Sequence, residues 1–199
     1  MDETIRNNYV LLRGTPCAEA YFSHRARSQD FYTLPLEVRR LSGAADTLNV
    51  TLRAGMLGAL RQGGRFCVEG ELRSFNNRRG DWPRLVITVF AHALFPTEED
   101  DENLTELRGT LCRAPNARRT PMGRDICDLL LAVNRSYGRS DYLPCICWGS
   151  QAREAALWDV GTRLALRGRV QSRRYVKLTE HGSEERVAFE VSAAELERL

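Results

Sequence analysis

Leu12-Arg13-Gly14-Thr15-Pro16-Cys17 recurs 95 residues later as Leu107-Arg108-Gly109-Thr110-Leu111-Cys112. The same offset, and then one of 98, relates further apolar, glycine, charged and serine positions of the two halves. The pairs are Val38 and Val133, Gly43 and Gly138, Asp46 and Asp141, Leu48 and Leu143, Gly63 and Gly161, Arg65 and Arg163, Gly70 and Gly168, and Ser74 and Ser172. A period near 95 is too long for a solenoid and has the length of a small domain. We therefore interpret the chain as a tandem duplication.

An acidic segment separates the two repeats. Residues 96–106 contain six acidic residues and no basic one, whereas residues 1–95 and 107–199 have net charges of +4 and +5. A stretch this acidic, with few apolar residues, is typical of a solvated linker. We expect a first domain over 1–95, a linker over 96–106 and a second domain over 107–199.

Each repeat consists mainly of predicted β-strands. In the second repeat, alternating or continuous apolar stretches predict strands over 104–113, 126–134, 141–148, 162–175 and 187–191. A short helix is expected over 150–158, with Ser150 as its N-cap and Gly161 after its end. Five strands with a helix between the third and fourth is the order of the OB-fold, a barrel that binds oligonucleotides. By itself the pattern supports only a small β-barrel.

The composition excludes several classes of protein. A hydrophobic fraction of 43% is enough to build a core. The longest apolar run, 129–133, is far shorter than the roughly 20 residues that span a membrane, and the N-terminus lacks a signal-peptide pattern. A bacterial or nuclear-cytosolic compartment is therefore the default. The narrower expectation of a bacterial, cytoplasmic and nucleoid-associated protein without a small-molecule substrate comes from the family resemblance given below.

The six cysteines predict neither a metal site nor disulfides. Without a secretory signal, three disulfides lose most of their support. Cys145 and Cys147 are too closely spaced for a zinc knuckle, and on a strand they share one face. We therefore expect both thiols in the core, and no metal or other cofactor.

The second repeat resembles the bacterial single-stranded DNA-binding proteins. The matching text is Arg108-Gly-Thr-Leu-Cys-Arg-Ala-Pro115, Arg118-Arg-Thr-Pro-Met-Gly123, Leu130-Leu-Ala-Val-Asn-Arg-Ser-Tyr137, Asp141-Tyr-Leu-Pro-Cys-Ile-Cys-Trp-Gly149, Gly168-Arg-Val-Gln-Ser-Arg-Arg-Tyr175 and Glu185-Arg-Val-Ala-Phe-Glu-Val191. The resemblance implies an OB-fold and sequence-tolerant binding of single-stranded DNA. The predicted fold class is therefore all-β, with one short helix per domain, as two tandem five-stranded OB-fold Greek-key barrels.

The resemblance also implies a set of aromatic residues that stack on bases, namely Tyr137, Tyr142, Trp148 and Tyr175. Strand alternation gives an independent argument for two of them. Tyr142, Pro144, Ile146 and Trp148 share one face of a strand, and the other face carries Leu143, Cys145 and Cys147. We expect the first face to be the stacking platform and the second to line the core.

A cluster of basic residues is expected to contact phosphate groups. Its members are Arg113, Arg118, Arg135, Arg169, Arg173, Arg174 and Lys177.

The first repeat lacks the aromatic set. Ser42, Thr47 and approximately Arg53 stand where the second repeat has Tyr137, Tyr142 and Trp148, so we interpret this domain as a degenerate OB-fold. Two alternatives stay open: it binds the DNA backbone through arginines or bases through a different platform, or it serves dimerisation. The arginines are Arg39, Arg40, Arg73, Arg78, Arg79 and Arg84, and the candidate platform is Tyr21, Phe22, Phe31 and Tyr32.

Assembly is the other expectation from the resemblance. Members of this family commonly act with four OB-folds, so a chain with two predicts a homodimer. They typically end in an acidic tail that recruits partner enzymes, and the sequence Ala-Ala-Glu-Leu-Glu-Arg-Leu199 does not match such a tail.

Three functions are compatible with these features of the sequence. The first is sequence-nonspecific binding of single-stranded DNA in replication, recombination or repair, mainly through the second domain. The alternative is a protein-interaction or assembly module on the same fold with weak or no DNA binding. RNA binding is a third option. No motif for hydrolysis or nucleotide binding is present, so an enzyme is not expected.

Overall fold

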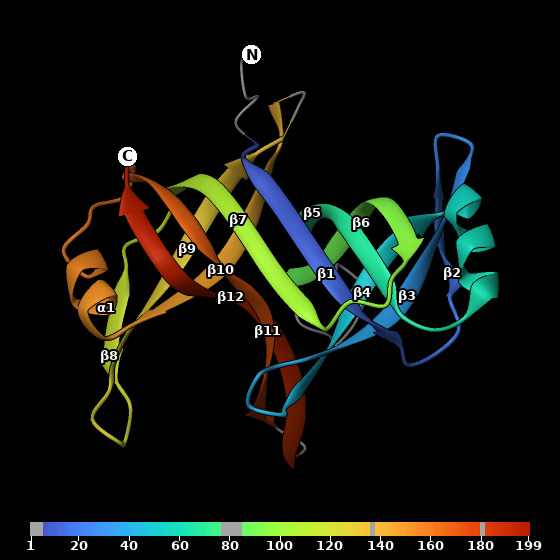
Figure 1. Cartoon of the computed structure of the whole chain (residues 1–199). Helices are drawn as coiled ribbons and strands as arrows, with labels where there is room; N and C mark the ends of the chain where they lie inside the picture. Colours follow the sequence, from blue (N-terminus) through green and yellow to red (C-terminus); the bar gives the residue numbers. More distant parts are fainter. Residues whose placement is uncertain (1–5, 77–84, 136–137, 180–181) are drawn as a thin grey trace. The chain divides into compact units, whose positions relative to one another are not determined.

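The computed structural model describes residues 6–76, 85–135, 138–179 and 182–199. It divides into two compact units, each described by itself (Figure 1). The first unit contains residues 9–73 and 87–104, and the second contains 105–199 with the described residues of 1–8 and 74–86. Among the helices of these described segments, none is both long and apolar enough to cross a membrane.

The first unit is a β-barrel with one short helix. Its strand order is β2-β3-β4-β6-β5-β1, and β1 also pairs with β3, which closes the sheet. The 3₁₀ helix η1 follows β4 and packs beside β3 and β4. The elements are β1 (Asn8–Pro16), β2 (Tyr21–Ala26), β3 (Gln29–Arg39), β4 (Ala45–Arg53), η1 (Ala54–Gln62), β5 (Phe66–Asn76) and β6 (Leu85–Pro96).

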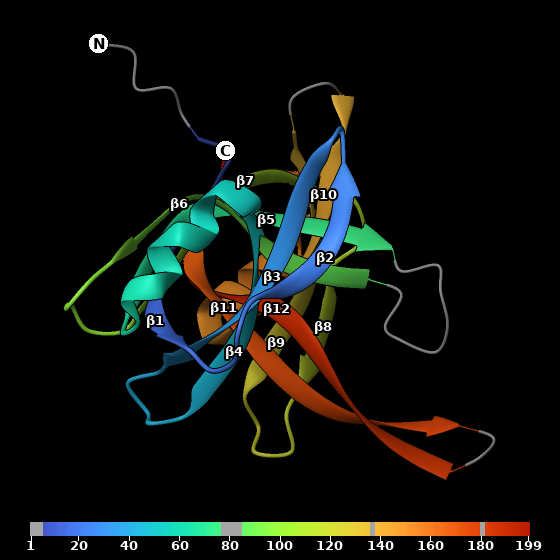
Figure 2. The ribbon, with the colours of Figure 1, turned by 90° about the vertical axis from the view of Figure 1, so that its right-hand side faces the viewer.

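The second unit repeats this plan. Its strand order is β7-β11-β12-β10-β9-β8, and β7 also pairs with β9. The elements are β7 (Glu102–Leu111), β8 (Asn116–Arg119), β9 (Asp125–Asn134), β10 (Ser140–Trp148), α1 (Gly149–Ala155), β11 (Arg163–Thr179) and β12 (Gly182–Arg198). Figure 2 shows the β11–β12 hairpin extending beyond the other strands of its unit. The predicted all-β fold class, with two tandem barrels and one short helix in each, is confirmed.

Some local predictions were wrong. Short strands β2 and β8, which form hairpins with β3 and β9, were not predicted, because their exposed side chains give no apolar alternation. Ser150 is not the helix N-cap: Trp148 precedes α1 in an extended conformation, and no side chain caps the helix. Trp158, which follows α1, is buried in the core.

Alternation decides which side chains form each core. Along β10, Leu143, Cys145 and Cys147 are at most 2% exposed, which confirms their predicted inward face. Described cysteines are all free thiols. Burial raises the pKa of the Cys147 thiol to about 12 and also raises the pKa of Cys145, so both act as small apolar groups.

The barrels close where glycine lets two backbones approach. A Cβ atom at Gly14 on β1 would lie 2.2 Å from the carbonyl oxygen of Glu37 on β3. At the equivalent point of the second unit, a Cβ at Gly109 would lie 2.9 Å from the carbonyl oxygen of Ala132 on β9. Cβ atoms in proteins do not come this close to a carbonyl oxygen, so only glycine fits here. The repeated Arg-Gly-Thr motif therefore marks the point of closure in each barrel.

The acidic segment is more ordered than a solvated linker. Strand β7 begins at Glu102 and takes up the last five residues of 96–106. Arg13 pairs with Glu99 at 2.7 Å, and Arg65 pairs with Asp101. The carboxylates of this segment thus form ion pairs with arginines of the first unit. The side chains in these pairs are part-exposed, and their opposite charges attract each other.

We predict that Gly70→Ala and Gly168→Ala each destabilise the protein. A Cβ would lie 2.2 Å from the carbonyl oxygen of Phe90 and 2.0 Å from that of Ser192, respectively. Strands β5 and β11 would have to shift, which costs about 1–3 kcal/mol and lowers Tm by about 2–12 °C in a protein of this size. Gly55→Ala is the matched control, because no atom lies within 4 Å of its Cβ position. Thermal unfolding at an unchanged Tm for both core variants would contradict this account.

Candidate nucleic-acid interface

Strand β10 presents two aromatic side chains on the outer face of the second barrel. Tyr142 is 49% exposed and Trp148 is 39% exposed. Trp148 ends the strand, directly before α1, and pairs across to Ile126 of β9. An indole held at a strand end with its surface in solvent can stack on any base, because every base has a π-face.

The predicted platform is interrupted at Ile146, which is 2% exposed. Alternation places Ile146 outward, but β10 is also paired in parallel with β12 at this point, where Ile146 lies opposite Ser192. Trp148 and Tyr142 are therefore separate stacking groups rather than parts of a continuous face.

Strand β11 supplies the third aromatic residue. Tyr175 is half-buried, and the guanidinium carbon of Arg173 lies 5.8 Å from the centre of its ring. Glu190, which is buried, pairs with Arg173 at 3.5 Å and accepts a hydrogen bond from Gln171 at 3.0 Å. The carboxylate orients the arginine beside the tyrosine. Sequence reasoning did not identify Glu190 or Gln171, because their roles depend on the register of β11 and β12.

Alternation along β11 divides the basic residues between two faces. Arg169 and Arg173 are exposed on the same face as Tyr175. Arg174 points to the opposite face, where it lies 3.6 Å from Glu185. Arg174 therefore lies on the other face of β11 from Arg173, and the predicted contacts of both residues with phosphate stay predictions.

Arg118 on β8 and Trp148 on β10 are separated by strand β9. Both residues are register neighbours of Ile126, Arg118 from β8 and Trp148 from β10. The guanidinium makes two hydrogen bonds to Asp128, of 2.7 and 3.0 Å, and these bonds raise its pKa. The pair holds Arg118 extended on the outer face.

Arg135 has a structural role that the sequence did not predict. Its guanidinium donates to both carboxylate oxygens of Asp141, which is fully buried. The first unit repeats the arrangement with Arg40 and the buried Asp46, joined by two bonds of 2.6 Å. Each pair spans the hairpin between two barrel strands, and the predicted contact of Arg135 with phosphate stays a prediction.

The remaining predicted residues are placed as follows. Arg113 is exposed in the turn after β7. Tyr137 and the side chain of Lys177 lie outside the described residues. Among the side chains that the structure describes, no group of three or more metal-ligating residues is found.

Known proteins resemble this chain in sequence and in fold. The model of the single-strand binding protein family matches residues 102–199. Single-stranded DNA-binding protein B of Bacillus subtilis is 34% identical over 80 residues, which are 37% of this chain and 71% of that protein. The chain belongs to the single-strand binding protein family. The single-stranded DNA-binding protein of Halalkalibacterium halodurans is also 34% identical over 80 residues, but these are 48% of its length. For most of the curated relatives, the match spans about half of the relative's length.

The structural likeness extends over both units of this family member. The wild-type single-stranded DNA binding protein of Thermus aquaticus has a TM-score of 0.78 and 25% identity, over 96% of this chain and 92% of that chain. A deletion mutant of the same protein has a TM-score of 0.76 and 24% identity. These matches support the tandem OB-fold assignment.

We predict that Asp141→Asn destabilises the second unit by about 3–5 kcal/mol, because it removes the charge that compensates a part-buried guanidinium. Asp128→Asn breaks the pair with Arg118, whose partners are both part-exposed, and is expected to cost less than about 1 kcal/mol. Urea unfolding of the two variants measures the difference. Equal losses of stability would show that Asp141 is not the structural residue we infer.

Proposed function

We propose that the protein binds single-stranded DNA without sequence preference, mainly through the second unit. Bases stack on Trp148, Tyr142 and Tyr175, and phosphates bind Arg118 and Arg173. Exposed Arg113 and Arg169 add charge to the same binding region. The observation that carries the proposal is the exposed indole of Trp148 on the same face as Arg118, with Ile126 of β9 between them, in a barrel whose family and relatives are named for this activity.

Stacking and charge explain why such a site tolerates any sequence. Each stacked base contributes about 1–3 kcal/mol, and three stacking groups together with arginines give useful affinity without contacts to base edges. Each arginine that neutralises a phosphate releases counterions, so affinity falls as salt rises. Duplex DNA keeps its bases stacked inside the helix and offers these aromatic residues only its backbone.

The cellular roles that fit this activity are replication, recombination and repair, in which single strands are exposed. A binding protein of this kind needs no catalytic group. Tyr137 and Lys177 remain part of the proposed site on the grounds of the family resemblance alone. Localisation with bacterial DNA follows from the same proposal.

Assembly is a second candidate function, and one surface favours it. The face of the β11–β12 hairpin opposite Tyr175 carries exposed aliphatic side chains: Val176 is 64%, Leu178 83% and Val187 41% exposed. Exposed aliphatic groups gathered on one face mark a contact with protein rather than with DNA. We propose a second copy of the chain as the partner, which would give a homodimer with four barrels.

We predict that Trp148→Ala weakens binding of a labelled oligo-dT by about 5- to 150-fold, the equivalent of one lost stacking interaction. Tyr175→Ala is expected to act in the same direction. Fluorescence anisotropy measures the affinity, and circular dichroism confirms that the variants fold. Leu157→Ala is the control, because this side chain is 83% exposed beside α1 and lies outside the proposed site.

Three outcomes would count against the assignment. Unchanged affinity of folded Trp148→Ala would remove Trp148 from the site. Wild-type protein that assembles but does not bind oligo-dT would favour the assembly function. Tighter binding of oligo-U than of oligo-dT would identify RNA as the ligand.

A further inference from the structure

In the first unit, two arginines bind the acidic segment that follows β6. Arg13 pairs with Glu99 at 2.7 Å and with Glu102 at 2.8 Å. Arg65 pairs with Asp101 and donates two hydrogen bonds, of 3.1 and 2.8 Å, to the backbone oxygen of Glu99. The acidic segment therefore lies over a surface to which β1 and the residue before β5 each contribute one arginine.

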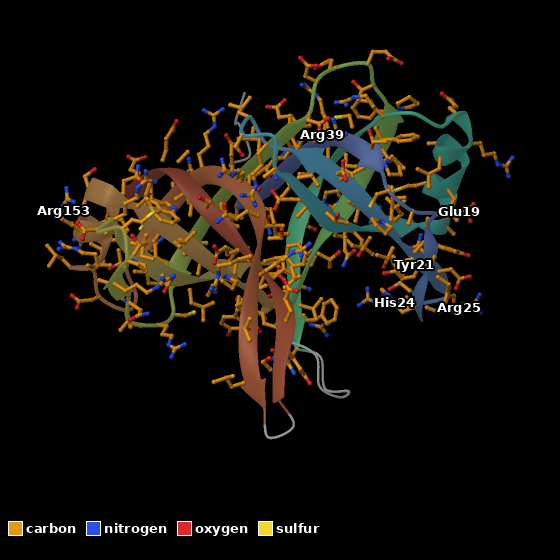
Figure 3. The ribbon with its side chains drawn as sticks, turned by 90° about the horizontal axis from the view of Figure 1, so that it is seen from below. Glu19, Tyr21, His24, Arg25, Arg39 and Arg153 are labelled. Carbon is orange, nitrogen blue, oxygen red and sulfur yellow. The ribbon has the colours of Figure 1, made fainter. Side chains whose placement is uncertain are left out.

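Two backbone hydrogen bonds hold the same segment in place. The N–H of Arg39, which is labelled in Figure 3, donates to a carboxylate oxygen of Asp101 at 2.6 Å. The N–H of Thr97 donates to the backbone oxygen of Arg65 at 3.1 Å. The first unit thus shows what this surface binds, which is a short peptide rich in carboxylates.

The second unit presents the same arginines at the equivalent positions. Arg108 is the repeat of Arg13 at the offset of 95 residues, and Arg163 is the repeat of Arg65 at the offset of 98. Arg163 lies opposite Thr110 in the register of β11 and β7, and Thr110 is two residues after Arg108 on the same face of β7. The register therefore brings both guanidinium groups to one surface.

A hollow of about 250 Å³ lies between these two arginines, and we call it the arginine hollow. Gly109 and Ala132 form part of its lining, and their lack of bulk leaves the space open. Thr110 and Asn134 add a hydroxyl and an amide to the lining, and Asn134 stands at the repeat of Arg39. The hollow is therefore polar and positively charged.

Within the part of the chain that the structure describes, no ion pair is found for Arg108 or Arg163. Both side chains are exposed, whereas their counterparts in the first unit are 24% and 33% exposed beside the acidic segment. Glu106, on the same face of β7, pairs instead with Arg167 at 3.6 Å. The two arginines thus carry a charge that suits an anionic partner.

The arginine hollow is distinct from the proposed DNA-binding site. Asn134 is eight residues along β9 from Ile126, which is the register neighbour of Trp148. Eight residues of a strand span about 26 Å. The residues of the hollow are also different from those that the proposed function uses.

We propose that the arginine hollow is a docking site for an acidic peptide segment of another protein. Carboxylates of that segment pair with Arg108 and Arg163, because the forked donors of a guanidinium match the two oxygens of a carboxylate. Charge complementarity and the occupant of the equivalent surface in the first unit both point to this chemistry. The inference does not depend on DNA binding by the second unit.

The test uses the full-length chain and a fluorescein-labelled peptide, Pro96-Thr-Glu-Glu-Asp-Asp-Glu-Asn-Leu104. The first unit holds its own copy of this segment, and a tethered segment has an effective concentration in about the millimolar range, so the added peptide reports on the second unit. Fluorescence anisotropy at low salt measures the affinity. Arg108→Ala and Arg163→Ala should each weaken binding by about 2- to 5-fold, and the double variant by about 4- to 25-fold.

Two controls separate charge from other effects. A peptide with Gln and Asn in place of Glu and Asp has the same length without the carboxylates and should not bind. Arg124→Ala removes an exposed arginine from the turn between β8 and β9, beyond the far end of β9, and should bind the acidic peptide as wild type does. Circular dichroism confirms that each variant folds.

The outcomes distinguish this site from the proposed DNA-binding site. Loss of peptide binding by the double variant, with its affinity for oligo-dT unchanged, would support the proposal. Equal peptide affinity of wild type and double variant, or equal binding of the neutral peptide, would overturn it. If wild type binds no oligo-dT but binds the peptide through the two arginines, the proposed function fails and this inference stands.

Other occupants of the hollow would also be detected. Displacement of the bound peptide by oligo-dT would assign the hollow to nucleic acid and overturn the proposal. Self-association of the wild-type chain that the double variant loses, measured by analytical ultracentrifugation, would make a second copy the occupant and would also overturn it.

Discussion

Barrel closure is the constraint on which the rest of the structure depends. Strand β1 must pair with both β3 and β5, and β7 with both β9 and β11, and each of these strands meets its second partner next to a glycine. Gly14 and Gly109 let the backbones approach closely enough to close the sheet. Closure decides which side chains face inward, and so it also decides which ones share the outer face.

Within that constraint, the two units have different surface chemistry. The second unit places an indole, a tyrosine and several arginines on its outer face, with Glu190 orienting Arg173. The first unit places histidines, phenylalanines and arginines on the corresponding face, with Arg53 where the second unit has Trp148. The buried Arg–Asp pairs are shared by both units, which is consistent with a role in folding rather than in binding. Duplication kept the scaffold, and the exposed positions diverged.

Much of the fold could be predicted from the sequence. Barrel closure requires glycine at particular positions, and strand alternation requires apolar residues at every second position. The repeated Leu-Arg-Gly-Thr text, the inward cysteines of β10 and the helix between the third and fourth strands were all predictable. The site was less so. Ile146 lies on the outward face of β10 and is nevertheless buried, which no local pattern reveals. The role of Arg135 depends on a carboxylate six residues away whose burial is a tertiary property.

Register explains the remaining differences. In the first unit, the ring contacts among His24, Phe31 and Phe90 join residues that are far apart in the sequence. These contacts depend on how the strands are aligned, which the sequence does not show. The acidic segment was interpreted from composition, which cannot show that Arg13 and Arg65 lie within reach of its carboxylates. In both cases the residue types were visible in the sequence and their partners were not.

The central claim is that this protein binds single-stranded DNA through stacking and charge. The most direct test is a titration of full-length protein with labelled oligo-dT of about 35 nucleotides, at low and near-physiological salt, with unlabelled duplex as competitor. The account predicts tight binding that weakens as salt rises and that duplex does not displace. Negligible binding at low salt by folded protein, or equal displacement by duplex, would contradict it.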